Sequence, residues 1–219
     1  MATDYNFYLN LSYVSVFSVC VPLIVGFVFI RHLKPNFIVL LYLLCADLLT
    51  ELIAHIFQKY NLHNLFIYRS FTLVQFVMLS VFFIKTLSPS KIALFIKIFI
   101  FVFFGIALFD LYKNGFNTPD DLSLAVSSVL LMIYSLLTFN YIIQNPVHTN
   151  ILSMPLFWFI TAVLIYFSSG LFLFIFSGYV LNFSNNFHYE LWSINSLLNI
   201  IFNLLIAIGF WKTKHRQIS

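Results

Sequence analysis

Seven apolar segments, each long enough to cross a lipid bilayer, fill almost the whole of this 219-residue chain. A membrane-spanning helix needs roughly 20 mostly apolar residues. Lipid offers no partner for backbone N–H and C=O groups, so each segment must satisfy its own as a helix. None shows the alternating polarity of a barrel strand. We expect spans at residues 11–30, 36–57, 62–84, 91–111, 122–143, 151–181 and 188–211.

The composition supports an all-α polytopic membrane protein with one domain, residues 1–219. The chain is 62% hydrophobic and 8% charged, whereas soluble proteins carry about 25% charged residues. Membrane lipids are therefore the expected surroundings. No basic run could track a phosphate backbone, so nucleic acid is not an expected partner. Cys20 and Cys45 lie inside apolar segments without disulfide or zinc spacing, and no cofactor is expected.

The distribution of Lys and Arg predicts the orientation of the spans in the membrane. Cytoplasmic loops are enriched in these residues. Seven of these residues fall on one side of the membrane, and two lysines in connecting segments fall on the other side. The predicted topology is N-terminus outside and C-terminus in the cytoplasm. The cytoplasmic set is Arg31, Lys34, Lys85, Lys91, Lys212, Lys214 and Arg216, and the outer set is Lys59 and Lys113.

The second span carries three ionisable residues on one stripe. Asp47, Glu51 and His55 follow one another at intervals of four residues, which places them on one helix face. A charge near the bilayer centre costs roughly 2.5–3.5 kcal/mol on insertion scales. Such residues normally face the interior of a helix bundle and find partners there. The two carboxylates are therefore the strongest candidates for a site, and His55 lies closer to water.

The third span offers partners for these acids. Tyr68 and Gln75 lie on one face of the predicted helix, and Arg69 lies about 100° away from Tyr68. Arg69 and Glu51 are at similar depth from the outer side. We predict an ion pair between Arg69 and Glu51, with Gln75 facing Asp47 a little deeper.

The seventh span repeats the polar stripe with amides. Asn195, Asn199 and Asn203 are also spaced by four residues, and amides in membrane helices bond across to other helices. If the second, third and seventh spans are neighbours, their polar faces enclose one outward-facing cavity. The alternative is that the same groups only hold the helices together. The predicted ligand-binding set is Asp47, Glu51, Tyr68, Arg69, Gln75, Asn195, Asn199 and Asn203.

Enzymatic chemistry has weaker support. The chain has no G-x-S-x-G, P-loop or G-x-G-x-x-G motif. Asp47, Glu51 and His55 could supply metal ligands, but a catalytic zinc site usually has more histidine. No catalytic residue is assigned, and a non-enzymatic role is favoured over an intramembrane lipid hydrolase.

Four stretches give the chain a family resemblance: LLCADLLTELIAHIF, NLHNLFIY, FTLVQFVML and INSLLNIIF before a short basic tail. In these it resembles small seven-helix membrane proteins of Bacteroidota, over roughly its whole length. Many such proteins have Glu where this chain has Gln75. The resemblance implies a multi-pass protein of the bacterial inner membrane with a sensory or signalling accessory role, and no particular reaction.

The first functional hypothesis is a receptor-like sensor. A small ligand, proton or cation would enter the outer polar cavity, and a cytoplasmic or membrane partner would receive the signal. The second hypothesis is a small-solute transporter. Spans 1–3 and 5–7 would form a parallel repeat joined by span four, with similar starts at Pro35 and Pro155. The lipid hydrolase and a purely structural subunit complete the alternatives.

Overall fold

The computed structural model describes residues 2–88, 90–116, 121–145, 150–180 and 185–215, and within these ranges the chain is helical without strands. Seven stretches are long and apolar enough to cross a membrane, which confirms the predicted helical class. The helices are α1 (Ala2–Ser18), α2 (Cys20–Val28), α3 (Pro35–Lys59), α4 (Leu65–Leu87), α5 (Lys91–Asn114), α6 (Asp121–Gln144), α7 (Pro155–Val180) and α8 (Asn185–His215), with short 3-10 turns η1 (Ile30–His32) and η2 (Ile151–Ser153).

The first predicted span is two helices rather than one. The α-helix is interrupted at Val19, between α1 and α2. Pro22 accounts for the break, because its ring has no N–H to donate and clashes with the carbonyl four residues earlier, that of Ser18. The sixth span also begins later than predicted, since residues 151–153 form η2 ahead of Pro155.

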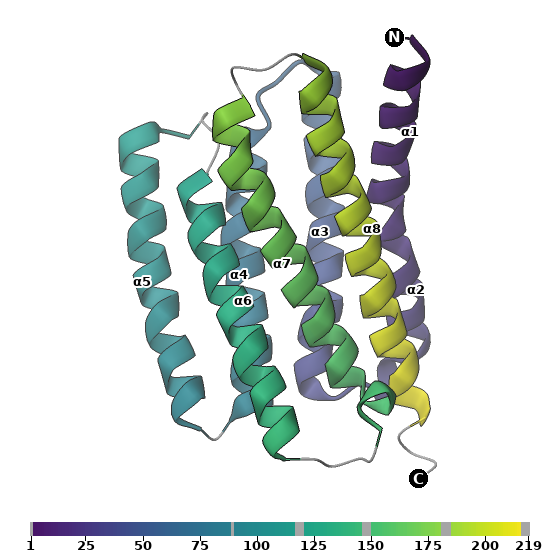
Figure 1. Ribbon diagram of the computed structural model, residues 1–219, viewed down its shortest axis with the longest axis vertical. Helices are drawn as coiled ribbons and strands as arrows, with labels where there is room; N and C mark the ends of the chain where they lie inside the picture. Colours follow the sequence, from purple (N-terminus) through teal and green to yellow (C-terminus); the bar gives the residue numbers. More distant parts are fainter. Residues whose placement is uncertain (1, 89, 117–120, 146–149, 181–184, 216–219) are drawn as a thin grey trace.

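The bundle has two main layers (Figure 1). In the front layer α7 lies between α6 and α8, and behind it α3 lies beside α4. On one flank α5 packs against α4 and α6. On the other flank α1 and α2 pack against α8. The polar face of α3 is therefore placed between the layers, next to α4 and α7.

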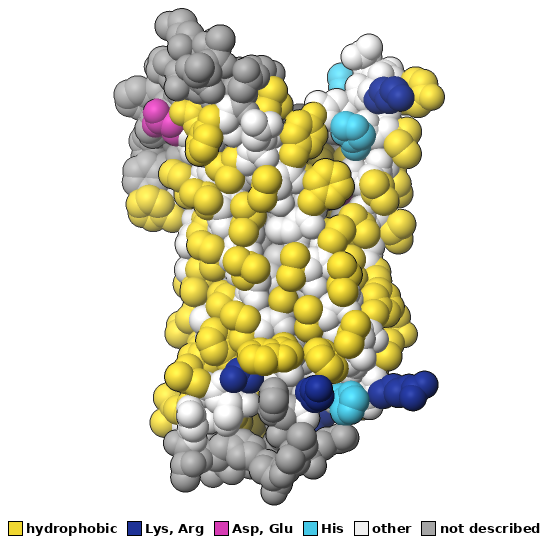
Figure 2. All heavy atoms as spheres, turned by 90° about the vertical axis from the view of Figure 1, so that its right-hand side faces the viewer, with side chains coloured by type: hydrophobic (Ala, Val, Ile, Leu, Met, Phe, Trp, Pro, Cys, Tyr) yellow, Lys and Arg dark blue, Asp and Glu magenta, His cyan; other side chains and the backbone are white. Residues whose placement is uncertain are grey.

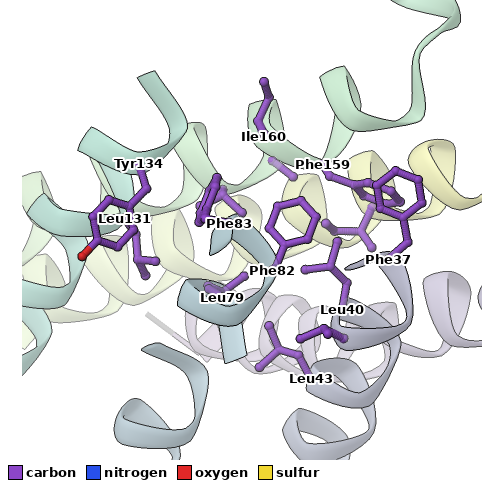
Figure 3. Close-up of a cluster of buried hydrophobic side chains, with 14 of the residues drawn as sticks. Phe37, Leu40, Leu43, Leu79, Phe82, Phe83, Leu131, Tyr134, Phe159 and Ile160 are labelled. Carbon is purple, nitrogen blue, oxygen red and sulfur yellow. The ribbon is translucent and has the colours of Figure 1, made fainter. Parts of the chain in front are cut away.

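The bundle has two ends, an N-terminal face and a C-terminal face. The N-terminal face holds the turn at residues 60–64 and Gly115, and the C-terminal face holds η1, η2 and the end of α8 (Figure 1). Near the C-terminal face, the rings of Phe37, Phe82 and Phe159 lie together between the layers (Figure 3), and Phe210 packs on Phe159. We call this set the phenyl layer: Phe37 of α3, Phe82 of α4, Phe159 of α7 and Phe210 of α8.

The phenyl layer closes the bundle interior. All four rings are at most 3% exposed. The centroid of Phe159 lies 4.8 Å from that of Phe37 and 5.1 Å from that of Phe210. These separations are typical of favourable aromatic pairs. Little space is left for water or solute to pass between the layers at this level.

Burial along α3 differs between its two halves. Its buried residues lie between Phe37 and Leu44, with Ala54 as the further member. Residues 45–53 are all at least partly exposed. Asp47 and Glu51 belong to this second half. Burial along α3 is thus greatest toward the C-terminal face and smaller around the two carboxylates.

The second and sixth spans begin in the same way. Each follows a 3-10 turn and starts with a proline, Pro35 in α3 and Pro155 in α7. Proline is suited to the first helical position, where no N–H is required, and it forces the residue before it into an extended conformation. Lys34 and Met154 have that conformation, with ψ of 156° and 120°.

Candidate functional site

Two carboxylates and two tyrosines form a polar cluster between α3, α4 and α7. The Tyr68 hydroxyl of α4 donates to Glu51 Oε2 at 3.4 Å. Asp47 lies one turn along α3 and interacts electrostatically with Glu51. Tyr166 of α7 is within electrostatic range of both acids. We call Asp47, Glu51, Tyr68 and Tyr166 the acidic cluster. Asp47 and Glu51 are four residues apart on α3, so they share one face of this helix.

The acidic cluster carries unbalanced negative charge. Asp47 forms no hydrogen bond with any residue that the structure describes. Among the described residues, no Lys or Arg lies within ion-pairing distance of Asp47 or Glu51. Both side chains are partly exposed rather than sealed in the core. Two adjacent carboxylates in a bilayer need a proton or a cation, because an isolated charge there is costly.

The predicted ion pair between Arg69 and Glu51 is wrong. Arg69 Nη2 instead donates to Asp110 Oδ2 of α5, and Arg69 Nη1 donates to the Gly115 carbonyl oxygen. Asn114 Nδ2 donates to the other carboxylate oxygen of Asp110 at 2.8 Å. The reason is the rotation of about 100° per residue. Tyr68 faces α3, so its neighbour Arg69 points around α4 toward α5.

Asp110 was missed by sequence reasoning, although a signal existed. It is the only Asp or Glu in the apolar segment 91–111. It lies near the end of that segment, at a depth in the membrane similar to that of Arg69. The side chains of Arg69 and Asp110 are 9% and 2% exposed, so this ion pair is buried. The pair joins α4 to α5 and leaves no arginine for the acidic cluster.

The amide stripe of α8 faces α1 and not the acidic cluster. Asn199 Nδ2 donates to Ser15 Oγ at 3.1 Å, and Asn203 Nδ2 donates to Ser18 Oγ at 2.8 Å. Both serines lie just before the helix break at Val19. The predicted single cavity between the second, third and seventh spans is therefore wrong for these two amides, because α8 packs on α1, α2 and α7.

The two remaining predicted residues are partly exposed and unbonded. Asn195 continues the α8 stripe, and Gln75 lies two turns along the Tyr68 face of α4. Neither forms a hydrogen bond with a described residue. Tyr166 was missed in the sequence, where nothing distinguishes it from other tyrosines of apolar spans. It is the member of the acidic cluster that packs on α8, because its ring lies against Phe202 with centroids 5.1 Å apart.

Metal binding finds no further ligands around Asp47 and Glu51. Across the described residues, no group of three or more His, Cys, Asp or Glu side chains is placed to hold a metal ion. His55 is exposed near the N-terminal face.

Comparison with known proteins gives no match: no family model, curated protein or solved structure is similar to this chain. The likeness to small membrane proteins of Bacteroidota stays a prediction.

Proposed function

We propose that the acidic cluster binds a small cation or a proton and that the protein is a receptor-like membrane sensor. One observation carries the proposal: Arg69 is held by Asp110, so Asp47 and Glu51 share a bilayer-depth site without a basic partner among the described residues. A bound positive charge would remove the cost of the two carboxylates. Asp47 and Glu51 are both partly exposed, so a small cation can reach their carboxylates.

The fold supplies a route from this cluster to the opposite face. Tyr166 is within electrostatic range of Asp47 and Glu51, and its ring packs on Phe202 of α8. From Phe202, α8 continues to Lys212 and Lys214 at the C-terminal face. A cation that binds one helix arrangement more tightly would shift the position of α8. The basic end of α8 would contact a partner protein or anionic lipid.

In the proposed orientation, the N-terminal face is external. Arg31, Lys85, Lys91 and Lys212 lie at the C-terminal face, and dark blue side chains gather at that lower end in Figure 2. This bias supports a cytoplasmic C-terminal face. Labelling a single cysteine introduced at Leu62 with a membrane-impermeant maleimide in intact cells tests the orientation.

We expect sodium to stabilise the purified protein against thermal unfolding through Glu51. A ligand present at about 100 times its Kd adds about 2.7 kcal/mol to the free energy of unfolding. Glu51→Gln keeps the shape of the side chain but removes the charge, so the stabilisation should disappear. The measurement is the unfolding temperature in sodium chloride and in choline chloride at equal ionic strength.

Glu190→Gln is the matched control for this experiment. Glu190 is an exposed residue of α8, and its neutralisation makes the same change in net charge. It should keep the sodium response of the parent. An equal response in Glu51→Gln would place the cation elsewhere. A parent that responds neither to sodium nor to acidification would remove the proposal.

Transport is the second candidate, and the arrangement of the two halves favours it. Both α3 and α7 follow a 3-10 turn and begin with a proline. The third helix of each half also packs on the first helix of the other, α4 on α6 and α8 on α1. Parallel repeats of this kind occur in transporters, with the substrate near the bilayer midplane. The phenyl layer would then be the closed gate below the acidic cluster.

Flux separates the two candidates. Proteoliposomes holding a transporter would accumulate radioactive sodium down its gradient, and Glu51→Gln would abolish the uptake while Glu190→Gln would not. A sensor would bind sodium without accumulating it inside the vesicles. Sodium binding without flux therefore supports the sensor, and Glu51-dependent flux supports the transporter.

A further inference from the structure

A cavity of about 600 Å³ opens at the C-terminal face, away from the acidic cluster. Its walls come from the start of α3, the end of α4, the end of α6 and the start of α7. The phenyl layer lies next to the cavity, because Phe37 belongs to that layer and also lines the cavity. The cavity is large enough for a small molecule or a lipid headgroup.

The charged lining of this cavity is basic. Lys34 lines it from the segment just before α3 and Lys85 from the last turn of α4, and no Asp or Glu is among its described lining residues. Lys85 is exposed, so its ammonium group can reach a ligand in the opening. Positive groups that converge on one opening favour an anion.

Neutral polar groups stand between the lysines. Asn36 Nδ2 donates to Thr86 Oγ1 at 3.0 Å, which links α3 to α4 at the cavity wall. Asn145 lines the opposite side from the end of α6. The Thr86 hydroxyl already donates to the Phe82 carbonyl oxygen, and Asn145 Nδ2 donates to the Tyr141 carbonyl oxygen. Because an amide Nδ2 carries two hydrogens, Asn36 and Asn145 each keep one N–H for a ligand. Oxygen atoms of a phosphate group accept such bonds strongly, and most strongly from charged donors.

The backbone has the same polarity as the lysines. Both α3 and α7 begin in the cavity wall, at Pro35 and Pro155. The N-terminal end of a helix carries a partial positive charge. Met154 and Leu156 add an apolar side to the lining. The cavity therefore combines positive potential with an apolar wall at the end of the membrane spans.

We infer that this cavity binds a phosphate-bearing anion through Lys85 and Lys34. The phosphate group can come from an anionic lipid headgroup at the membrane surface or from a soluble anion. Both sources present the same negatively charged oxygens to the two lysines. The site is independent of the proposed cation site, because none of the acidic cluster residues lines the cavity.

Two binding measurements on the full-length protein test the inference and identify the source. The first titrates phosphatidylglycerol and counts bound lipid by native mass spectrometry after release from detergent. The second measures radiolabelled inorganic phosphate by equilibrium dialysis, with the protein in phosphatidylcholine nanodiscs. Lys85→Gln should weaken the responding ligand about tenfold, since a lost hydrogen bond to a charged group is worth about one decade in affinity.

Lys91→Gln is the matched control, because Lys91 is exposed at the same face but does not line the cavity. It should change affinity by less than about twofold, which is the scale of a screened surface charge. Lys85→Arg keeps the positive charge and should retain binding, which separates loss of the site from misfolding.

A response to phosphatidylglycerol alone assigns the lipid headgroup, and a response to inorganic phosphate alone assigns a soluble anion. Responses in both measurements support a site that accepts the phosphate group from either source. Absence of binding in both measurements overturns the inference. So does an equal loss in Lys85→Gln and Lys91→Gln, because the attraction would then be a general property of the basic face.

Discussion

Asp110→Asn should lower the free energy of unfolding by about 3–5 kcal/mol, the cost of breaking a buried ion pair from one side. The substitution leaves the Arg69 guanidinium buried between α4 and α5 without its counter-charge. The Gly115 carbonyl and the Asn114 amide cannot replace a carboxylate, since one is neutral and the other is itself a donor at this site. Unfolding in mixed detergent micelles, followed by circular dichroism, measures the loss.

The double variant makes this expectation specific to the pair. Arg69→Gln alone should cost about as much as Asp110→Asn, but the two together should cost clearly less than their sum, because neither charge is then left alone. Lys113→Gln is the control, since Lys113 is an exposed residue of the same turn of α5. Additive losses in the double variant would show that Arg69 and Asp110 act separately. Coupling of Arg69 to Glu51 instead would restore the pairing that the sequence predicted.

The helices were predictable because they depend on local properties of the chain. Length and continuous apolarity define a span wherever its neighbours lie, and six of the seven predicted spans each contain one long α-helix. The stripe of Asp47 and Glu51 follows from helix periodicity alone, as does the shared face of Tyr68 and Gln75 on the next span. Predicting these features requires only that one helix, or two consecutive helices, be predicted correctly.

The partner of Arg69 could not be predicted in the same way. Depth in the membrane matched Arg69 to Glu51, but an ion pair also requires the correct rotation about the helix axis. One residue changes that rotation by about 100°, which exchanges α3 for α5 as the neighbour. The sequence shows the depth of each group and the angles within one helix. It does not show which helix lies on each side.

The amide stripe of α8 illustrates the same limit. Asn199 and Asn203 were correctly placed on one face, but the structure puts that face against α1. The acceptors of these amides, Ser15 and Ser18, lie in the last turn of α1, just before the break at Val19. Hydrogen bonds of this kind hold membrane helices together for about 0.6–2 kcal/mol each.

The phenyl layer is a third feature that composition alone leaves open. The chain has 29 phenylalanines, and their apolar surface suits lipid and protein neighbours equally. Phe159 is fully buried whereas Phe101 is 78% exposed, although both lie inside apolar helices. What distinguishes Phe159 is the close approach of α8, and that approach depends on Gly209.

Gly209→Ala should therefore destabilise the protein by about 1–3 kcal/mol, the usual cost of an extra methyl group in a packed core. A Cβ atom at Gly209 would lie 2.6 Å from Cδ1 of the Phe159 ring. The ring cannot turn away freely, because Phe37 and Phe210 enclose it. The unfolding temperature in detergent and the near-ultraviolet circular dichroism of the aromatic rings measure the effect.

Gly105→Ala is a matched control within the same chain. Gly105 also lies inside an apolar helix, but a Cβ atom there meets no atom within 4 Å. Alanine should leave the stability unchanged or raise it by up to about 1 kcal/mol, because glycine is the poorer helix former. Phe159→Leu combined with Gly209→Ala should recover part of the loss, since the smaller side chain gives room to the methyl group. Equal effects of the two glycine substitutions would mean that helix propensity, and not the contact between α8 and the phenyl layer, sets the response.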